Sequence, residues 1–412
     1  MREKIKKIKE ASLLLLSTKE QQRVQVLTNL AMLLRKEVKQ ILKENEKDLI
    51  QAKEQKLNSA IIDRLNLNPD RIEKMAIAVE AIANFEQVVG IIESQKEHIN
   101  GLLIKKERIP LGVILMIFES RPNVIIEAAA LAIKSSNALI LKGGKEAKYS
   151  NQVLADILKK SMQSILPENS IDVLDSTDRK SIEELLQMND LIDLVVPRGG
   201  ENLIKMVYEK SKIPIIAHYK GVCHLYIDES APLDNSLEII INSKLQRPGV
   251  CNALETLLIH KGHIKNLENF FNNLSEQGTI LYGCKKCMKE FRGLMKREAT
   301  EEDWHAEYLS PELAVKIVGG VDEAIAHIQK YGSRHTEAIL SQDKAHLEKF
   351  QKSIDASCIV LNASTRFNDG GELGLGAELG ISTSKLHAYG PMGAKEMTTT
   401  RFVVSGNNHI RK

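Results

Sequence analysis

The pattern of hydrophobic and polar positions divides the chain into a helical first part and an alternating remainder. Up to about residue 95, apolar residues recur at helical spacing among Lys, Glu and Gln, with a break near Asn66–Pro69, which predicts a series of amphipathic helices. Residues 99–111 predict short extended segments that could form a hairpin arm. Residues 112–118 are an unbroken apolar run, which is typical of a strand buried on both faces.

From residue 112 onward, short apolar runs alternate with helical patterns. A helix is expected to begin behind Pro122, because proline is favoured in the first helical turn. Further helices are expected over 146–162 and 179–188. The alternation predicts right-handed βαβ units that form an open parallel sheet. The strands expected in this sheet are 112–118, 138–141, 171–174, 191–196 and 213–216.

A second alternating series runs from about His224 to about Leu361. The fold class is therefore α/β, with two open parallel-sheet domains. Residues 397–404 are prone to β structure but have no sheet of their own, so we expect them to pair with the 99–111 arm or with a neighbouring subunit. The strands expected in the second series are 225–228, 254–260, 313–318, 336–340 and 358–361.

Composition and charge narrow the class of protein. The 412 residues carry 57 Lys and Arg against 54 Asp and Glu, a formal charge of +3, and only 4% are aromatic. Neither a nucleic-acid partner nor a membrane partner is expected from this balance. The basic, leucine-rich residues 1–17 resemble a secretory signal, but their apolar core is too short and no cleavage site follows. An odd number of cysteines, five, is typical of a reducing cytoplasm.

Two short motifs have ambiguous meaning. Gly374 and Gly376, followed by Gly380, nearly match a dinucleotide fingerprint, but the strand–turn–helix context is missing, so a flexible loop near substrate is expected instead. Cys284 and Cys287 could be half a zinc site or a redox pair. Because no second ligand pair with suitable spacing follows, we expect no metal and two solvent-side thiols without function.

Cys251 is the first candidate for catalysis. It closes the Pro/Gly turn Arg247–Cys251, directly before the apolar strand expected at 254–260. A thiol at such a turn can face a cleft, and neighbouring backbone N–H groups can bind an oxyanion, which are the requirements of a cysteine nucleophile. From the spacing alone, a buried structural cysteine fits equally well.

A second candidate follows the strand expected at 138–141. Lys142, Gly143, Gly144 and Lys145 bring backbone and positive charge to the carboxyl edge of the sheet, where an anion could bind. A helix N-terminal turn that is merely basic is the alternative.

Six stretches together resemble the aldehyde dehydrogenase superfamily, and within it the branch that reduces γ-glutamyl phosphate. The likeness spans nearly the whole chain. It implies an aldehyde dehydrogenase-like fold, with an NADP-binding domain at 1–98 and 112–223, a catalytic domain at 224–390, and an oligomerisation arm at 99–111 and 391–412. The stretches are 118–124, 196–202, 221–228, 247–256, 331–339 and 362–371.

The resemblance assigns roles to single residues. Cys251 matches the nucleophile, Lys142 with Gly143 matches the adenosine-ribose site, and Glu307 matches the glutamate that holds the nicotinamide ribose. Lys145 stands where many NAD-linked relatives carry an acidic residue, so it would accept a 2′-phosphate and favour NADP. The turn beside the nicotinamide is matched by Pro197, Arg198, Gly199 and Gly200.

One departure from hydrolytic relatives is informative. Those enzymes carry a glutamate base in the segment that matches residues 216–220, and no carboxylate stands there in this chain. An acyl group exchanged with phosphate needs no activated water, so the departure supports acyl-phosphate chemistry.

The oxyanion donor and the substrate ligands are less defined. In direct register Arg121 occupies the position of the asparagine that hydrolytic relatives use, with Asn123 two residues on. We favour Asn123 as the neutral donor and keep Arg121 as a phosphate-binding alternative. Motif membership suggests further ligands for the substrate's anionic groups, namely His224, Arg334, His335 and Arg366.

The function implied by the resemblance is NADPH-dependent reduction of L-glutamate 5-phosphate to glutamate 5-semialdehyde, a step of proline biosynthesis. A dimer or tetramer is expected, and coupling to the glutamate kinase that makes the labile substrate is possible. Three rival readings stay open: a non-phosphorylating aldehyde dehydrogenase, a catalytically dead scaffold, and a cysteine hydrolase that uses Cys251 without nicotinamide.

Overall fold

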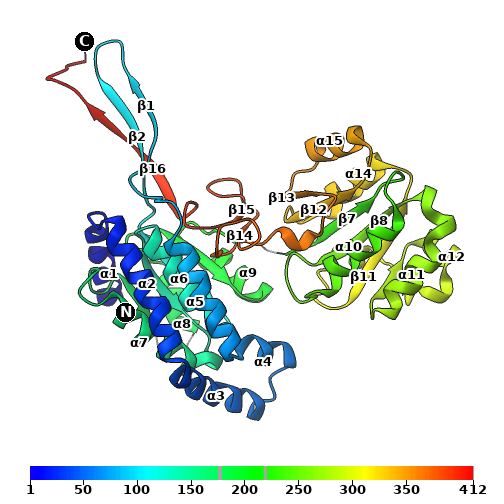
Figure 1. The fold of residues 1–412 in the computed structure, drawn as a ribbon, viewed down its shortest axis with the longest axis horizontal. Coiled ribbons are helices and arrows are strands. Elements are labelled where there is room, and N and C mark those ends of the chain that lie inside the picture. The colour runs from blue at the N-terminus through cyan, green and yellow to red at the C-terminus, as the bar shows by residue number, and fades with distance from the viewer. Residues whose placement is uncertain (175–178, 218–219, 412) are drawn as a thin grey trace. The chain divides into compact units, whose positions relative to one another are not determined.

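A computed structural model describes residues 1–174, 179–217 and 220–411. The chain divides into two compact units (Figure 1). The first unit comprises residues 1–217, 374–380 and 392–412, and the second comprises 218–373 and 381–391. Residues 374–380, expected within the 224–390 domain, thus group with the first unit, as do the arm and tail.

Five helices open the first unit, as the helical periodicity predicts. The helices α4 and α5 begin at asparagine caps, since the side chains of Asn58 and Asn68 accept hydrogen bonds from the backbone N–H groups of Ile61 and Arg71. The series ends at residue 83, so the expectation of helix up to about residue 95 was wrong. The helices are α1 (Arg2–Leu15), α2 (Glu20–Lys36), α3 (Val38–Glu54), α4 (Ser59–Leu65) and α5 (Pro69–Ala83).

A four-stranded parallel sheet forms the core of this unit. Its order is β5-β4-β3-β6, and every residue of β3 and β4 is buried. The strand expected at 213–216 is reduced to a single bridge between Ile215 and Val195. The strands are β3 (Val113–Phe118), β4 (Ala138–Lys142), β5 (Ile171–Val173) and β6 (Leu194–Arg198).

The register of this sheet brings three predicted site segments to one edge. Ile117 pairs with Lys142, and Phe118 pairs with Arg198, so the carboxyl ends of β3, β4 and β6 lie side by side. The loops that leave this edge lead into helices, where small ligands commonly bind in open α/β sheets. The helices are α6 (Asn123–Lys134), α7 (Lys148–Met162, after the short turn η1, Lys145–Ala147), α8 (Arg179–Leu186) and α9 (Glu201–Lys210).

The arm is a three-stranded antiparallel sheet that projects from the rest of the first unit (Figure 1). Its strands are β1 (Ile92–Glu97), β2 (Leu103–Pro110) and β16 (Thr398–Ser405), in the order β1-β2-β16. The C-terminal segment therefore pairs with the arm of its own chain, the first of the two pairings expected. The hairpin begins at residue 92, earlier than expected. The first strand was not foreseen because the residues of β1 are exposed throughout and show no apolar alternation.

The second unit is built on a seven-stranded parallel sheet in the order β10-β9-β11-β8-β7-β12-β13. All five expected strands are present, but the two short strands β9 and β10, which lie at one end of the sheet, were missed. The strands are β7 (Cys223–Ile227), β8 (Leu254–His260), β9 (Ile280–Gly283), β10 (Arg297–Glu298), β11 (Glu312–Val318), β12 (Thr336–Leu340) and β13 (Cys358–Leu361).

Helices cover this second sheet, and an apolar core fills the space between them. One cluster includes Phe270, Phe271 and Leu274 with residues of β8 and β11, and another includes Phe350 with Ile325. Within the described residues, no helix has both the length and the apolar character to span a bilayer. The helices are α10 (Leu233–Leu245), α11 (Leu267–Glu276), α12 (Lys285–Glu290), α13 (Glu301–Trp304), α14 (Val321–Tyr331) and α15 (Lys344–Ser353), with the short turns η2 (Lys261–Asn266), η3 (Arg292–Leu294) and η4 (Thr365–Phe367) and the ribbon β14 (Ile381–Ser382) and β15 (Gly390–Pro391).

Candidate active site

Cys251 lies half-buried in the turn between α10 and β8. Its backbone is held by the start of the neighbouring strand β7. The Cys223 thiol donates to the carbonyl oxygen of Cys251 at 3.1 Å. Burial raises the pKa of Cys223 well above its usual value, so this group stays protonated and able to donate. The candidate nucleophile is therefore an accessible thiol on a fixed backbone.

Gly221 packs closely against the same peptide group of Cys251. A Cβ atom at this buried position would lie 2.0 Å from the Cys251 carbonyl oxygen and 2.8 Å from its Cα. Because no side chain fits between the two backbone segments, only glycine allows this approach.

Of the substrate ligands predicted in the second unit, Arg366 is the one whose contacts among the described residues reach the turn that carries Cys251. From η4, its guanidinium contacts the side-chain oxygen of Asn252 and donates from Nε to Gln246 Oε1 at 2.8 Å. Burial lowers the pKa of Arg366. The negative charges of Asp369 and of Cys251 in its thiolate form oppose this effect and raise the pKa. Coulomb attraction is mutual, so the Arg366 cation favours the thiolate that a nucleophile needs.

Asn252, the residue after Cys251, is held in place by the segment that carries Arg366. Asn252 is only 4% exposed. Its side-chain amide donates to the carbonyl oxygen of Asn368 at 2.9 Å, and its own carbonyl oxygen accepts from Thr365 Oγ1 at 2.7 Å. These contacts orient the backbone around Cys251, and neither was foreseen from the sequence.

Two of the predicted substrate ligands are buried in the second unit. His224 and His335 are both 0% exposed. The ring nitrogen Nδ1 of His224 pairs with Glu337 Oε2 at 2.9 Å, and Nδ1 of His335 lies 2.7 Å from Thr336 Oγ1 and 3.8 Å from Cys223 Sγ. Side chains enclosed in this way support the strands near Cys251, and their role as substrate ligands stays a prediction.

Arg334 is exposed, on a backbone with φ of +63°, and its Nε lies 3.8 Å from Asp355 Oδ2. The contacts established among the described residues do not link Arg334 with Cys251. Its role as a substrate ligand stays a prediction.

Glu307 lies half-buried in the loop between α13 and β11. The loop is fixed on both sides of this residue. Tyr308 donates its hydroxyl hydrogen to Asp303 Oδ1 at 2.8 Å, and the N–H of Leu309 donates to Glu255 Oε1 at 3.4 Å. Glu307, predicted to hold the nicotinamide ribose, thus sits on a loop with a defined conformation.

A buried ion pair supports that loop, and sequence reasoning missed it. Lys244 and Glu255 are both 0% exposed, with Nζ and Oε2 2.6 Å apart. Burial raises the pKa of Glu255 to about 7, against the opposing effect of Lys244. The sequence did contain a signal for this ion pair, since a glutamate such as Glu255 inside a largely apolar strand requires a partner.

In the first unit, Lys142 ends β4, and its buried ammonium donates to the carbonyl oxygen of Gly143 at 2.9 Å. A Cβ atom on Gly143 would lie 2.3 Å from Asn151 Nδ2 and 3.1 Å from the Phe118 ring. Asn151 and Phe118 therefore already fill the space that a side chain at this position would need. Lys145 is exposed in η1, directly before α7, so strand, glycines, lysines and helix follow one another as predicted.

The turn predicted to lie beside the nicotinamide connects β6 to α9. Pro197 and Arg198 belong to β6, Gly199 is exposed, and Gly200 caps α9. The N–H of Gly200 donates to Glu119 Oε2 at 2.9 Å. A carboxylate at a helix N-terminus shows that the position suits negative charge; Glu119 was not foreseen.

Asn123 and Arg121, the two alternatives for the oxyanion donor, line one small pocket of the first unit. Asn123 Nδ2 donates to Glu127 Oε1 at 2.9 Å, and Arg198 pairs with Glu378 at 3.1 Å. Glu378 comes from the glycine-rich segment, which is a loop without dinucleotide geometry. Both candidate roles stay predictions.

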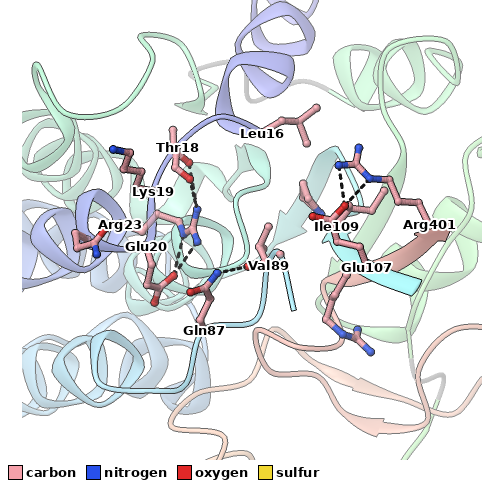
Figure 2. Close-up of a pocket in the computed structure, with 14 residues that line it drawn as sticks. Leu16, Thr18, Lys19, Glu20, Arg23, Gln87, Val89, Glu107, Ile109 and Arg401 are labelled. Carbon is pink, nitrogen blue, oxygen red and sulfur yellow. Dashed lines mark hydrogen bonds and ion pairs between the residues drawn. The ribbon is translucent and has the colours of Figure 1, made fainter. Parts of the chain in front are cut away.

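A larger pocket lies at the base of the arm and is lined by none of the predicted site residues (Figure 2). Its charged groups are engaged with one another. Arg401 binds Glu107 at 2.9 Å, and Arg23 binds Glu20 at 2.8 Å. This pocket is therefore no candidate for the active site.

Cys287 is fully buried, so the expectation of two solvent-side thiols at Cys284 and Cys287 was wrong. Among the described residues, no group of three or more His, Cys, Asp or Glu is placed to hold a metal ion. Of the segment 216–220, which lacks the hydrolytic glutamate, His218 and Tyr219 lie outside the described residues.

Comparison with known proteins gives the family. A family model described as the aldehyde dehydrogenase family matches residues 4–282. The gamma-glutamyl phosphate reductase of Desulfatibacillum aliphaticivorans is 48% identical over 388 residues, which cover 94% of this chain and 92% of that protein. The crystal structure of gamma-glutamyl phosphate reductase from Thermotoga maritima matches with a TM-score of 0.95 and 39% identity, covering 100% of this chain and 99% of that one.

A more distant match shows the fold alone. An engineered glycolyl-CoA reductase with bound NADP+ has a TM-score of 0.71 at 17% identity, with 98% of this chain and 96% of that chain covered.

The chain therefore belongs to the aldehyde dehydrogenase family, a class of oxidoreductases whose fold it shares. Membership implies a nicotinamide cofactor. Within that family, its full-length similarity places it among the gamma-glutamyl phosphate reductases.

Proposed function

We propose that the protein reduces γ-glutamyl phosphate to glutamate 5-semialdehyde and phosphate with NADPH, through a thioester on Cys251, as the second step of proline biosynthesis from glutamate. One observation carries the proposal: the half-buried Cys251 thiol stands on a backbone held by Gly221 and Cys223, within the field of the Arg366 cation. These are the conditions for a thiolate nucleophile.

The first half of the reaction is acyl transfer. The Cys251 sulfur attacks the acyl carbon, a C–S bond forms, and the bond to the phosphate oxygen breaks as phosphate leaves. Arg366 stabilises the thiolate before the attack and can balance the negative charge that develops during it. Asn123 is proposed as the neutral oxyanion donor, with Arg121 as the alternative.

The second half is reduction of the thioester. A nicotinamide cofactor, when bound, supplies the hydride for this step. The thiohemiacetal then releases the aldehyde, and the Cys251 thiolate is regenerated. The residues proposed to hold the cofactor are Lys142, Gly143, Lys145, the 197–200 turn and Glu307, and the two lysines supply the positive charge that a 2′-phosphate requires.

Phosphate dependence tests the reaction class. In the oxidative direction, with glutamate 5-semialdehyde and NADP+, we expect NADPH formation only when inorganic phosphate is present, because the thioester has no activated water to hydrolyse it. The measurement is the absorbance of NADPH against phosphate concentration. Turnover at the same rate without phosphate would instead identify a non-phosphorylating dehydrogenase, and hydrolysis without nicotinamide would identify a cysteine hydrolase.

Lys145 is proposed to select NADPH over NADH. Lys145→Glu replaces a partner of the 2′-phosphate by a repelling charge, and a charge-assisted hydrogen bond contributes about 1.5–3 kcal/mol. We therefore expect the ratio of kcat/KM for NADPH to that for NADH to fall by about 10- to 100-fold. Lys159→Glu, the same charge change near the far end of α7, is the control and is expected to leave the ratio unchanged. An unaltered ratio in Lys145→Glu would place recognition of the 2′-phosphate elsewhere.

We propose a cytoplasmic homo-oligomer, a dimer or tetramer, assembled through the arm. Phe402 is 70% exposed and Val404 is 56% exposed, and both face the same side of β16. An exposed apolar strand face of this kind is typical of an interface. Coupling to the glutamate kinase that supplies the labile acyl phosphate is proposed on chemical grounds alone.

A further inference from the structure

Cys284 and Cys287 lie at the junction of a strand and a helix in the second unit. The strand β9 ends at Gly283, Cys284 caps α12, and Cys287 lies in its first turn. The two sulfur atoms are 3.7 Å apart. A Cβ on Gly283 would lie 2.6 Å from the Cβ of Cys287, so glycine allows this close packing. The turn thus brings two thiols to within a small rotation of bonding distance.

The two thiols differ in exposure and acidity. Cys284 is half-buried, whereas Cys287 is fully buried, with its sulfur 3.8 Å from the carbonyl oxygen of Val315. The hydrogen bond between Cys284 and Cys287 is the largest effect and, with backbone hydrogen bonds and against the effect of burial, lowers the pKa of Cys284 to about 5. The same hydrogen bond and burial raise the pKa of Cys287. One thiol is therefore an accessible thiolate, and the other is a protonated thiol directly behind it.

The proposed reductase reaction uses neither of these two sulfur atoms. A zinc site is not supported either, because structural zinc needs four ligands and no cluster that could hold a metal occurs in the described part of the chain. A Cys-x-x-Cys motif between a strand and a helix, in an α/β unit, is typical of thiol–disulfide exchange. An accessible thiolate backed by a buried thiol matches that chemistry.

We propose that Cys284 and Cys287 are a redox site that forms a reversible disulfide within the chain, with Cys284 as the attacking sulfur and hydrogen peroxide as the oxidant. In the first step, an S–O bond forms on Cys284 as the O–O bond breaks, and hydroxide leaves and takes a proton from solvent. In the second step, the Cys287 sulfur attacks Cys284, the S–S bond forms, the S–O bond breaks, and the leaving hydroxide takes the thiol proton as water. Each disulfide consumes one peroxide and yields two waters, and a dithiol reductant reverses it.

The test uses the full-length reduced protein. After treatment with one equivalent of hydrogen peroxide, free thiols are blocked and the protein is digested with trypsin, which cleaves after Lys285 and Lys286. We expect a disulfide-linked peptide pair containing Cys284 and Cys287, which disappears after treatment with dithiothreitol. In Cys287→Ser, Cys284 is expected to accumulate as sulfenic acid, which dimedone traps.

A labelling rate provides a second measurement that needs no variant. At pH 6, Cys284 is mostly thiolate, whereas burial raises the pKa of the half-buried Cys358 above its usual 9.0, which leaves about 0.1% or less as thiolate. Although a thiolate of low pKa is intrinsically less nucleophilic, we expect iodoacetamide to modify Cys284 at least about tenfold faster than Cys358.

Two results would overturn the proposal: no linked peptide under conditions that oxidise other cysteines of the chain, or labelling of Cys284 no faster than that of Cys358. Neither readout involves reduction of γ-glutamyl phosphate, so failure here is separate from failure of the proposed function.

Discussion

Cys251→Ala is expected to lower kcat for reduction of γ-glutamyl phosphate by at least about 10⁴-fold. Without the sulfur no thioester forms, and the loss of a covalent nucleophile removes nearly all of the chemical step. NADPH binding is expected to persist, since the proposed ligands of its adenosine half, Lys142 and Lys145, belong to β4 and η1. The measurements are single-turnover oxidation of NADPH and a fluorescence titration of NADPH on the same preparation.

Cys358→Ala is the matched control for this variant. Cys358 is also half-buried and also in the second unit, but it lies in the edge strand β13 and has no proposed role in the reaction. Wild-type turnover is expected in this variant. Turnover within tenfold of wild type in Cys251→Ala would refute the nucleophile assignment and leave the resemblance without its chemical basis.

The strands that the sequence predicted best are those buried on both faces. Residues 113–118 are a continuous apolar run, residues 254–260 are mostly apolar, and every position of both is buried, as is typical of strands in a parallel sheet covered by helices. The short strands β9 and β10 were missed because two to four residues carry no readable period. The strand β1 was mistaken for helix because its six exposed residues, Ile92–Glu97, show neither helical nor alternating burial.

The position of Cys251 could be predicted, but its supports could not. A Pro/Gly turn before a buried strand is a local pattern, so Cys251 was visible in the sequence. The hydrogen bond from Cys223 joins residues 28 positions apart, and the contact from Arg366 to Asn252 joins residues 114 apart. Contacts of this range depend on the order of strands in the sheet, which periodicity does not specify.

The burial of His224 could not be predicted for the same reason, because it also depends on contacts between strands that are distant in the sequence. Its motif was recognised, but exposure is set by the sheet that forms around it. The strands on either side of β7 enclose the histidine, and its partner Glu337 comes from β12. A buried polar side chain needs a hydrogen-bond partner, and here the partner comes from another strand, so the sequence could indicate that His224 matters without indicating how.

Gly221→Ala is expected to lower kcat about 100-fold without removing any reactive group. Real Cβ atoms essentially never lie within 3.0 Å of another heavy atom, and the new Cβ would lie 2.0 Å from the Cys251 carbonyl oxygen, which is backbone and has no rotamer to change. The Cys251 peptide group must therefore move by about 1 Å, which also breaks its hydrogen bond to Cys223. A misplacement of about 1 Å in a reacting group can cost about 100-fold in rate.

Gly249→Ala is the matched control, because it makes the same substitution two residues from Cys251. Its Cβ would meet only the Leu309 carbonyl oxygen at 3.7 Å, an ordinary contact, and Gly249 has no positive φ. We expect near-normal kcat in this variant, and we expect Gly221→Ala to keep a Cys251 thiol that iodoacetamide still modifies. If both variants lost activity equally, general strain of the turn would explain the result. If Gly221→Ala folded with wild-type kcat, the backbone position of Cys251 would not limit the reaction, and the contact between these two segments would have only a structural role.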